Sequence, residues 1–598
     1  MAAANRRRLA KFTASEVLKQ VLADNGTDDE TEDSTDSGSD YEDNVTEVSE
    51  QSDTEEEDNR TGSNNDTTEG CIQTAVAERG RGRGRGRGTG RGGKSGRGSV
   101  EDRREDDRPS GQAERSSSGQ PLFGKNKFVW HCDPPAAGRR REQDIIRTPP
   151  GVTSASQCDN IVDTFHLLIT AEIIDNIVLQ TNREGKRRTI DWNAVHPDHQ
   201  PREWKAVTDV EIRAFIGLCI LAGVYKCNHE STHRLWSEDE GRPVFKATMS
   251  RNRFTDILKF MRFDDKTSRP QRQQTDKLAA FADIWAMFVN QLPKYYIPGT
   301  DLCIDEQLVA FRGRAPFRQY IPSKPAKYGI KIWWCCDAET CYPLAGQVYI
   351  GKQPEEQREV GQGARVVQDL ISSWRHSGRN VVADNFFTSV ELAQNLLVQG
   401  LTFVGTIRSN KPHIPEAMRA NSRRPEHSSI FGFSDQITLV SYVPKVGKSV
   451  IVLSTMHHDK AIEGSLSKPE IIHHYNACKS GVDNLDHLVT MYTSRRKTNR
   501  WPMVLFWNMI DVAAVGAFIL WLGNNTQWEV SKGRRRRNLF LRQLGYDLVK
   551  LQMELRAQIS TLQAPIRLLM NIVISNDCQT LMLILLLANY AIVLKKIV

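Results

Sequence analysis

One stretch of the chain, residues 301 to 408, constrains the fold more than any other. It reads as three consecutive strands, LCIDEQLVAF, KYGIKIWWCCD and CYPLAGQVYIG, with turn residues between them. A helical pattern from Ala364 to Trp374, the strand NVVAD, a helix from Ser389 to Leu397 and the strand LTFVGTIR follow. Three strands followed by alternating helix and strand predict an α/β domain.

Three aspartates occupy distinctive positions in this pattern. Asp305 and Asp384 each follow a short β-prone run, and Asp483 opens a long apolar helical pattern. Strand ends are where active sites of α/β sheets tend to lie. An RNase H-like fold carries carboxylates on its first strand, after its fourth strand and on a late helix. The three aspartates match these slots, so the sequence predicts an RNase H-like catalytic domain.

Carboxylates that converge in this way favour one chemistry. Three of them repel one another, and at least one would be driven to protonate without a cation between them. Mg²⁺ (or Mn²⁺) prefers oxygen ligands, and a pair of such ions supports in-line displacement at phosphorus. We therefore interpret Asp305, Asp384 and Asp483 as catalytic residues and metal ligands. The alternative is that each is an ordinary turn or cap residue.

Basic residues gather next to these acids, at strand and helix ends. Such groups favour contact with a phosphate backbone and salt-dependent binding, although a solvated surface is the alternative for any single residue. The candidate DNA-binding residues are Arg312, Arg314, Arg318, Lys324 and Lys327; Arg408 and Lys411; and Arg495, Arg496, Lys497 and Arg500.

The first 119 residues have the composition of a disordered tail. Residues 28 to 58 are rich in Asp and Glu without Lys or Arg, and residues 79 to 97 form an Arg-Gly tract. Neither stretch can bury enough apolar surface to offset the entropy of ordering. The Arg-Gly tract indicates either RNA binding through charge and stacking or an inert linker. Basic runs at 6–8, 139–141 and 534–537 suggest a nuclear protein.

Other patterns concern the core. Thr208 and Glu211 form a capping box before a helix with a wide apolar face. The apolar stretch WPMVLFWNMIDVAAVGAFILWL is nearly long enough to span a membrane, but Asn508 and Asp511 lie in its middle, so a buried helix is predicted. The eleven cysteines are scattered, which favours a reducing compartment. Cysteines 335, 336 and 341 lack zinc spacing and are interpreted as core residues.

Several blocks resemble the piggyBac family of DNA transposases and their domesticated relatives. The blocks are IDEQLVAFRGRAPFRQYIPSKPAKYGIKIW, ADNFFTS, GTIRSNK, SGVDNLDHL and SRRKTNRWPM, within residues 123 to 562. The resemblance implies an Mg²⁺-dependent triad of Asp305, Asp384 and Asp483. It also implies that Asp486 is an accessory metal ligand and that Trp501 lies close to the transposon end.

The resemblance further implies a domain plan. The expected divisions are a disordered tail (1–119), a first helical dimerisation and DNA-binding part (120–299), a first RNase H-like catalytic part (300–409), a β-rich insertion (410–470), a second catalytic part (471–492), a second helical part (493–563) and an atypical hydrophobic tail (564–598).

The implied activity is cut-and-paste transposition by a homodimer. Strand cleavage at transposon ends, hairpin intermediates and insertion of duplex DNA at TTAA targets are expected. The alternative function is that of a non-catalytic nuclear protein that binds DNA or RNA through the inherited scaffold.

The end of the chain departs from the family. The resemblance implies a Cys/His-rich zinc domain, but only Cys578 follows Cys478, so no zinc site is expected. The apolar run from 581 to 594 is shorter than the roughly 17 residues of a membrane helix, and no membrane partner is predicted. We interpret the last residues as the product of a different reading frame.

Overall fold

The computed structural model describes residues 119–135, 145–351 and 359–575. The acidic segment, the Arg-Gly tract, residues 139–141 and the run around Cys578 lie outside these ranges. The described residues all belong to one compact unit.

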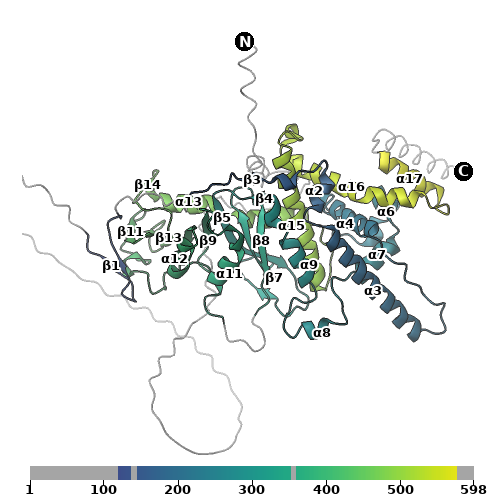
Figure 1. The fold of residues 1–598 in the computed structure, drawn as a ribbon, viewed down its shortest axis with the longest axis horizontal. Coiled ribbons are helices and arrows are strands. Elements are labelled where there is room, and N and C mark those ends of the chain that lie inside the picture. Colours follow the sequence, from purple (N-terminus) through teal and green to yellow (C-terminus); the bar gives the residue numbers. More distant parts are fainter. Residues whose placement is uncertain (1–118, 136–144, 352–358, 576–598) are drawn as a thin grey trace, which may run out of the picture. The chain divides into compact units, whose positions relative to one another are not determined.

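A nine-stranded mixed sheet lies at the centre of this unit (Figure 1). The strand order is β11-β12-β13-β10-β9-β5-β7-β6, and β8 also pairs with β7. The neighbours β5, β9 and β10 run parallel, and the other pairs are antiparallel. The strands are β5 (Asp301–Ala310), β6 (Gln319–Tyr320), β7 (Tyr328–Asp337), β8 (Pro343–Val348), β9 (Asn380–Ala383), β10 (Thr402–Thr406), β11 (Ser429–Ser434), β12 (Ile437–Tyr442) and β13 (Val450–Ser454). The predicted combination of a sheet with flanking helices is therefore confirmed.

Three two-stranded sheets lie outside the central sheet. They are formed by β1 (Leu122–Phe123) with β2 (Val129–Trp130), β3 (Gly151–Val152) with β4 (Tyr296–Ile297), and β14 (Ile462–Glu463) with β15 (Lys468–Pro469).

The register of the parallel strands brings their ends together. Asp301 pairs with Asn380 where β5 and β9 begin, and Ile304 pairs with Ala383 three residues later. Both strands are buried here because each is covered on two faces, which suits their apolar sequence. The residues that follow, Asp305 and Asp384, therefore reach the same edge of the sheet.

The strands between residues 410 and 470 extend this same sheet. β13 pairs antiparallel with β10, and β12 and β11 continue outward. An unpaired β10 would leave a row of backbone groups open, and β13 satisfies them. The β-rich segment foreseen in the sequence is thus continuous with the central sheet.

Helices precede and follow the sheet in sequence. Before it come α2 (Ile161–His166), α3 (Ala171–Val195), α4 (Asp209–Val224), α5 (Thr232–Leu235), α6 (Pro243–Thr248), α7 (Arg251–Phe260), α8 (Arg269–Arg272), α9 (Ala282–Val289) and α10 (Leu292–Tyr295); after it come α15 (Trp501–Asn524), α16 (Arg536–Ala557) and α17 (Ala564–Ser575). Short 3₁₀ helices are η3 (Ser154–Ser156), η4 (Ser372–Trp374), η5 (Glu416–Met418) and η6 (Val530–Arg535). The predicted capping box is present: the Thr208 hydroxyl accepts from the amide of Glu211 at 3.2 Å, and the Glu211 carboxylate accepts from the amide of Thr208.

The helices before and after the sheet pack on each other. α4 and α16 cross where Gly217 faces Leu548, and a Cβ on Gly217 would lie only 2.8 Å from the Cβ of Leu548. The glycine therefore allows the two backbones to approach closely. The apolar stripe of α16 formed by Leu541, Leu544 and Leu548 is buried at this crossing, whereas Leu551 and Leu555 farther along remain about half exposed.

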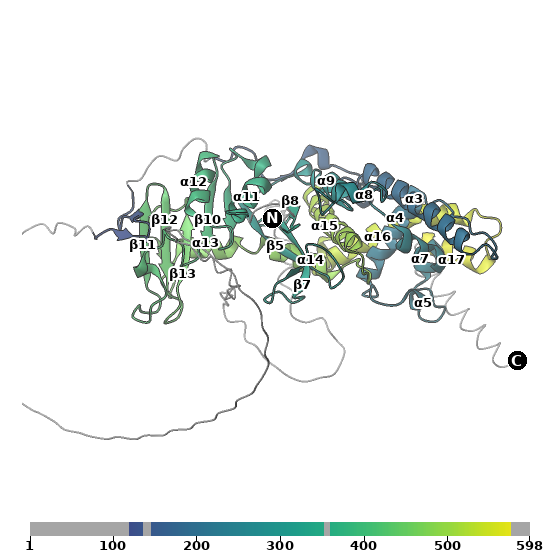
Figure 2. The same ribbon diagram turned by 90° about the horizontal axis from the view of Figure 1, so that it is seen from below.

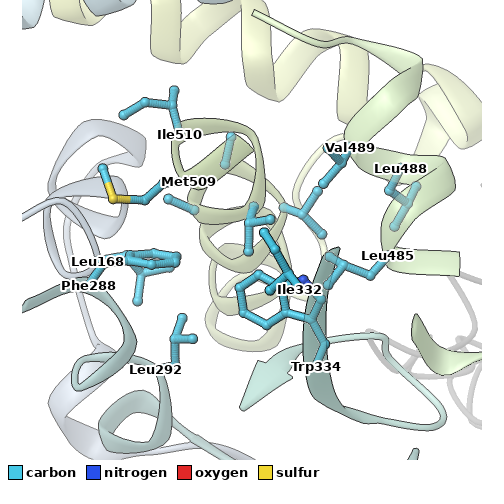
Figure 3. Packing of buried hydrophobic residues seen from close by; sticks show 14 of the residues in the cluster. Leu168, Phe288, Leu292, Ile332, Trp334, Leu485, Leu488, Val489, Met509 and Ile510 are labelled. Carbon is cyan, nitrogen blue, oxygen red and sulfur yellow. The ribbon is translucent and has the colours of Figure 1, made fainter. Parts of the chain in front are cut away.

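The apolar helix α15 is buried as predicted. Among the described residues it is the one helix long and apolar enough to cross a membrane, yet its apolar window lies wholly inside the protein. Figure 3 shows Met509 and Ile510 of α15 among side chains of the neighbouring helices and of β7. Its polar residues are satisfied, since Asn508 donates to Gln307 and Asp511 accepts from Thr493 and Ser494.

Four helices lie against the central sheet. They are α11 (Gln362–Leu370), α12 (Val390–Val398), α13 (Glu470–Cys478) and α14 (Gly481–Met491). α14 packs on β5 and β7 (Figure 2), on the sheet face that carries Cys303, Asp305 and Gln307. α11 lies on the opposite face, where Arg365 donates to Gln347 of β8. This arrangement places α14 and the end of β5 side by side.

Candidate active site

Asp305 and Asp384 lie at one edge of the central sheet. Asp305 is inside β5 and Asp384 directly follows β9, and both side chains are partly buried. An Asp305 oxygen accepts from the backbone amide of Glu306 at 2.7 Å, and an Asp384 oxygen accepts from that of Phe386 at 2.9 Å. Backbone amides thus orient both carboxylates.

Asp483 comes to this edge from α14, where it lies in the first turn with 63% of its side chain exposed. The approach of α14 depends on Gly481, because a Cβ there would lie 2.8 Å from the Cβ of Cys303 in β5. The Cys303 thiol also donates to the carbonyl of Lys479 at 3.1 Å. A small residue at the start of the helix therefore brings Asp483 to the strand that carries Asp305.

The electrostatics of these acids show mutual repulsion. Burial, followed by the charges of Glu306, Asp384 and Asp483, raises the pKa of Asp305 well above its ordinary value. Burial and Glu306 raise the pKa of Asp384 to about 6, although the Phe386 amide and Lys331 act in the opposite direction. Two acids whose pKa values rise because of neighbouring acids form a site that favours a cation.

The acids are spread too widely for a single compact ion site. Among the described residues, the only acid, His or Cys group whose ligand atoms all lie within 4.8 Å of one another is elsewhere in the fold. A pair of ions about 3.5–4 Å apart needs a wider set of oxygens than one ion does. The donor set, which consists of carboxylate oxygens, fits Mg²⁺ or Mn²⁺ in chemistry.

Two residues at this edge have roles that the sequence analysis missed. The negative charge of Glu306 raises the pKa of both Asp305 and Asp384. Its position next to Asp305 is the feature of the sequence that could have identified this role. Lys324, expected only as a DNA contact, has its Nζ 3.7 Å from Asp483 and 3.8 Å from Glu306. The charges of Asp305, Glu306 and Asp483 raise its pKa, although burial alone would lower it. An ammonium group therefore lies between the acids of the strand and of the helix.

Asp486 lies deeper, in a network centred on the buried Gln307. The Gln307 amide nitrogen donates to Asp486 at 2.8 Å, and its oxygen accepts from Trp334 of β7 and Asn508 of α15, each at 3.0 Å. Burial raises the pKa of Asp486. This network joins β5, β7, α14 and α15 beneath the acidic edge. The polar Asn508 inside an apolar helix was the sequence signal for it.

The predicted basic residues differ in exposure. Those exposed or partly exposed are Arg312, Arg314, Arg318, Lys324, Lys327, Arg408, Lys411, Arg495, Lys497 and Arg500. Arg318 donates to the carbonyl of Arg312 and lies over the ring of Tyr328, and Arg408 donates to Asn385, next to Asp384. Arg408 therefore carries charge near the acidic edge, where it acts to lower the pKa of Asp384.

Two of the predicted DNA contacts are instead engaged inside the protein. Arg496 is buried and donates to the carbonyl of Asn228. Arg500 donates to carbonyls between Leu258 and Met261, and burial lowers its pKa to about 9. Trp501 packs edge-on against Phe317, with ring centroids 5.0 Å apart. In this conformation Arg496 and Arg500 attach the 493–500 segment to the helices rather than facing a phosphate.

Comparisons with known proteins indicate the family of the chain. A family model described as Transposase IS4 matches residues 161–518. The human PiggyBac transposable element-derived protein 3 is 25% identical over 316 residues, which cover 49% of this chain and 52% of that protein. The human PiggyBac transposable element-derived protein 5 is 22% identical over 391 residues, covering 60% and 70% of the two chains.

A solved structure is also similar. It is a piggyBac transposase synaptic complex with hairpin DNA, 38% identical to this chain, with a TM-score of 0.66 and coverage of 72% of this chain and 88% of that one. The chain matches about half the length of the first curated relative and most of the solved one. The family model spans more than half of the chain, and the similar proteins indicate that the group of transposases concerned is the piggyBac group. The chain therefore belongs to the piggyBac family of transposases and transposable element-derived proteins.

Proposed function

We propose that this chain is a divalent-metal-dependent DNA transposase that cleaves and transfers strands at the acidic edge of its sheet. The single observation that carries the proposal is the convergence of acids from β5, β9 and α14: burial and the charges of Glu306, Asp384 and Asp483 raise the pKa of Asp305, and burial and Glu306 raise that of Asp384. Such a group is unfavourable in a purely structural role, since a core or turn aspartate is normally neutralised by donors. Family membership supplies the reaction class.

The roles follow from placement. Mg²⁺ or Mn²⁺, when bound, would activate a water or 3′-hydroxyl and stabilise the leaving oxygen. Asp305 and Asp384 would hold the ions from the rigid sheet, and Asp483 would complete the set from α14. Glu306 adds negative charge at the same edge, and Asp486 supports α14 through Gln307. Lys324, already beside Asp483, is placed to neutralise a phosphate oxygen once metal replaces it among the acids.

Duplex DNA is the proposed substrate. Lys324 lies beside Glu306 and Asp483, and the charge of Arg408 acts on Asp384, which supports backbone contact without base reading. The solved relative is a complex with hairpin DNA, which favours the same substrate for this chain. We further propose that the protein recognises transposon ends and TTAA targets and that its reaction passes through hairpin intermediates. The proposed catalytic fold is RNase H-like and lies inside a split helical domain.

We also propose that the active form is a nuclear homodimer. The half-exposed side chains Leu551, Leu555 and Ile559 continue the apolar stripe of α16 beyond its crossing with α4, which supports a partner copy. Sedimentation at micromolar concentration checks the dimer, and a monomer throughout would contradict it. Imaging of the tagged full-length chain in cells checks the proposed nuclear location.

A cleavage assay tests the catalytic proposal. Full-length protein is incubated with Mg²⁺ and duplexes that carry family-type terminal repeats next to TTAA, and nicks and hairpins are resolved on denaturing gels. Separate Asp305→Asn, Asp384→Asn and Asp483→Asn variants are expected to lower cleavage by at least about 100-fold, the size typical of removing transition-state stabilisation. Asp369→Asn, an exposed acid on α11, is the matched control and should cleave normally.

The alternative, a binding protein without catalysis, predicts a different result. Salt-dependent DNA binding with no cleavage product, and equal binding by wild type and the three variants, would favour it. The human relatives are named transposable element-derived proteins, which is the reason to keep this alternative.

A further inference from the structure

A second cluster of metal-ligand side chains lies at the opposite ends of the same parallel strands. Asp301 begins β5, and His474 and Cys478 lie one turn apart on α13. The ligand atoms of these three residues all lie within 4.8 Å of one another. His474 Nε2 is 2.9 Å from an Asp301 oxygen and 4.0 Å from the Cys478 sulfur.

These distances are close to those of a zinc site. Zinc–nitrogen and zinc–oxygen distances near 2.0–2.1 Å and a zinc–sulfur distance near 2.3 Å put tetrahedral ligand atoms roughly 3.3–3.7 Å apart. Entry of an ion would need shifts of roughly half an ångström: the Asp301–His474 pair opens and the sulfur moves inward. Spacing of His and Cys by four residues on one helix presents both on the same face.

His457, which is nine-tenths buried, lies beside this cluster. Its ring centroid is 5.2 Å from that of His474, and its Nδ1 pairs with the Ser454 hydroxyl at 2.9 Å. Among the described residues, the set whose ligand atoms lie within 4.8 Å of one another does not include His457, so the cluster supplies three protein ligands and leaves the fourth position of a tetrahedral ion open.

Outer residues orient the carboxylate. Asn380 donates to one Asp301 oxygen at 2.7 Å and the Thr300 hydroxyl donates to the other at 2.7 Å, while the Thr402 hydroxyl donates to Asn380. Such supporting hydrogen bonds are typical around metal ligands. They also keep Asp301 ionised, because hydrogen bonds from His474, Thr300 and Asn380 outweigh burial and lower its pKa.

We propose that Asp301, His474 and Cys478 bind a zinc-class divalent ion that ties α13 to the beginnings of β5 and β9. The mixed sulfur, nitrogen and oxygen donors favour zinc over magnesium. Binding releases the thiol proton to solvent, and the two negative ligands balance the charge of the ion. The site revises the expectation that the chain has no zinc site. Because Cys478 precedes Asp483 by five residues, the ion would also hold the segment from which α14 starts.

Metal titration of the full-length chain tests the proposal. Chelator-stripped protein is titrated with Zn²⁺ against a chromophoric chelator, with millimolar Mg²⁺ present to occupy the acidic edge. We expect one tight Zn²⁺ per chain, and Cys478→Ser and His474→Gln should each weaken it by about tenfold or more. With Co²⁺ in place of Zn²⁺, a sulfur-to-cobalt absorption band should appear and should vanish in Cys478→Ser.

Matched variants separate this site from others. Cys158→Ser, at another partly buried free cysteine, should keep the cobalt band and the zinc affinity. The double variant Asp305→Asn/Asp384→Asn should also keep both, whatever the outcome for catalysis. Zinc affinity and cobalt spectrum unchanged in both Cys478→Ser and His474→Gln, or no tight Zn²⁺ in the wild type, would overturn the proposal and leave a hydrogen-bonded Asp-His pair.

Discussion

Strand β5 carries two aspartates four residues apart on the same face of the sheet, Asp301 at its start and Asp305 in its middle, and their environments are opposite. Asp301 is surrounded by donors, namely His474, Asn380 and Thr300, and these outweigh burial to lower its pKa. Asp305 is surrounded by acids, and burial together with those acids raises its pKa. The same residue type on the same strand is thus stabilised by several donors at the start of the strand and crowded by acids in its middle.

The difference between Asp301 and Asp305 indicates where a cation is required. A carboxylate that accepts several hydrogen bonds is stable as an anion without further partners. A carboxylate among carboxylates must take up a proton or attract a cation, and in this structure Lys324 supplies part of that charge. The carboxyl end of the sheet is therefore the end at which added Mg²⁺ should act.

The first prediction concerns the metal response of the acidic end. Saturating Mg²⁺, at about 100 times its Kd, should stabilise the wild type by about 2.7 kcal/mol, a shift in Tm of several degrees. Asp305→Asn/Asp384→Asn should fold and lose this response. Asp301→Asn should lower the Tm in both conditions yet keep the Mg²⁺ shift. Differential scanning calorimetry measures all three, and an Mg²⁺ shift retained by the double variant would reject the triad.

The second effect concerns the support beneath the acids. Gln307→Ala removes three hydrogen bonds and leaves the buried donors of Trp334 and Asn508 without an acceptor. At about 1–3 kcal/mol for each unsatisfied group, a loss of roughly 3–5 kcal/mol in the free energy of unfolding is expected. Chemical denaturation measures it. Gln319→Ala, at a partly exposed glutamine, should change stability by under about 1 kcal/mol.

A third effect is the dependence of stability on pH, to which Asp384 and Asp301 contribute with opposite signs. The pKa of Asp384 rises from 3.8 to about 6 in the folded state, so between these pH values the folded chain holds a proton that the unfolded chain has released. The free energy of unfolding of the metal-free protein should fall as pH rises through this window, by on the order of 1–2 kcal/mol. Asp301 acts with the opposite sign: its contribution is present above its unfolded pKa and is lost as pH falls through its lowered folded pKa.

Two controls isolate the contribution of Asp384. Asp384→Asn should flatten the fall in stability between about pH 4 and 6, and Mg²⁺ should flatten it in the wild type. Asp511, buried in α15 with a pKa also raised to about 6 by burial, contributes a similar slope that Mg²⁺ should not change. If stability falls with pH equally in Asp384→Asn and in the wild type, the prediction is contradicted.

The smallest effect concerns the lysine between the acids. Lys324→Met removes a cation that competes with metal, so the Mg²⁺ affinity of the protein should rise a few-fold, in keeping with about 0.2–1 kcal/mol for a partly exposed ion pair. Calorimetric titration measures it. Lys327→Met, an exposed neighbour on the same loop, should leave the affinity unchanged. A weaker Mg²⁺ affinity in Lys324→Met would show that the lysine organises the acids rather than competing with the ion.

The sequence by itself determined the order of the elements and the position of Asp384 directly after a strand, whereas the structure places Asp305 inside β5 rather than at its end. Strand alternation, the capping box of Thr208 and the apolar length of α15 are local patterns, and local patterns depend on neighbouring residues alone. The buried state of α15 was also predictable, because Asn508 and Asp511 would be costly in lipid.

Only the tertiary structure decided which charges meet. Lys324 and Arg500 look alike in the sequence as basic residues beside an acidic block, yet one lies between acids and the other donates to carbonyls of α7 and the loop after it. In the same way, Asp301 and His474 are 173 residues apart and become partners at 2.9 Å. The physical reason is that a side chain's electrostatic state depends on burial and on neighbours across the fold, and these are set when distant segments pack together, as α13 and α14 do on β5.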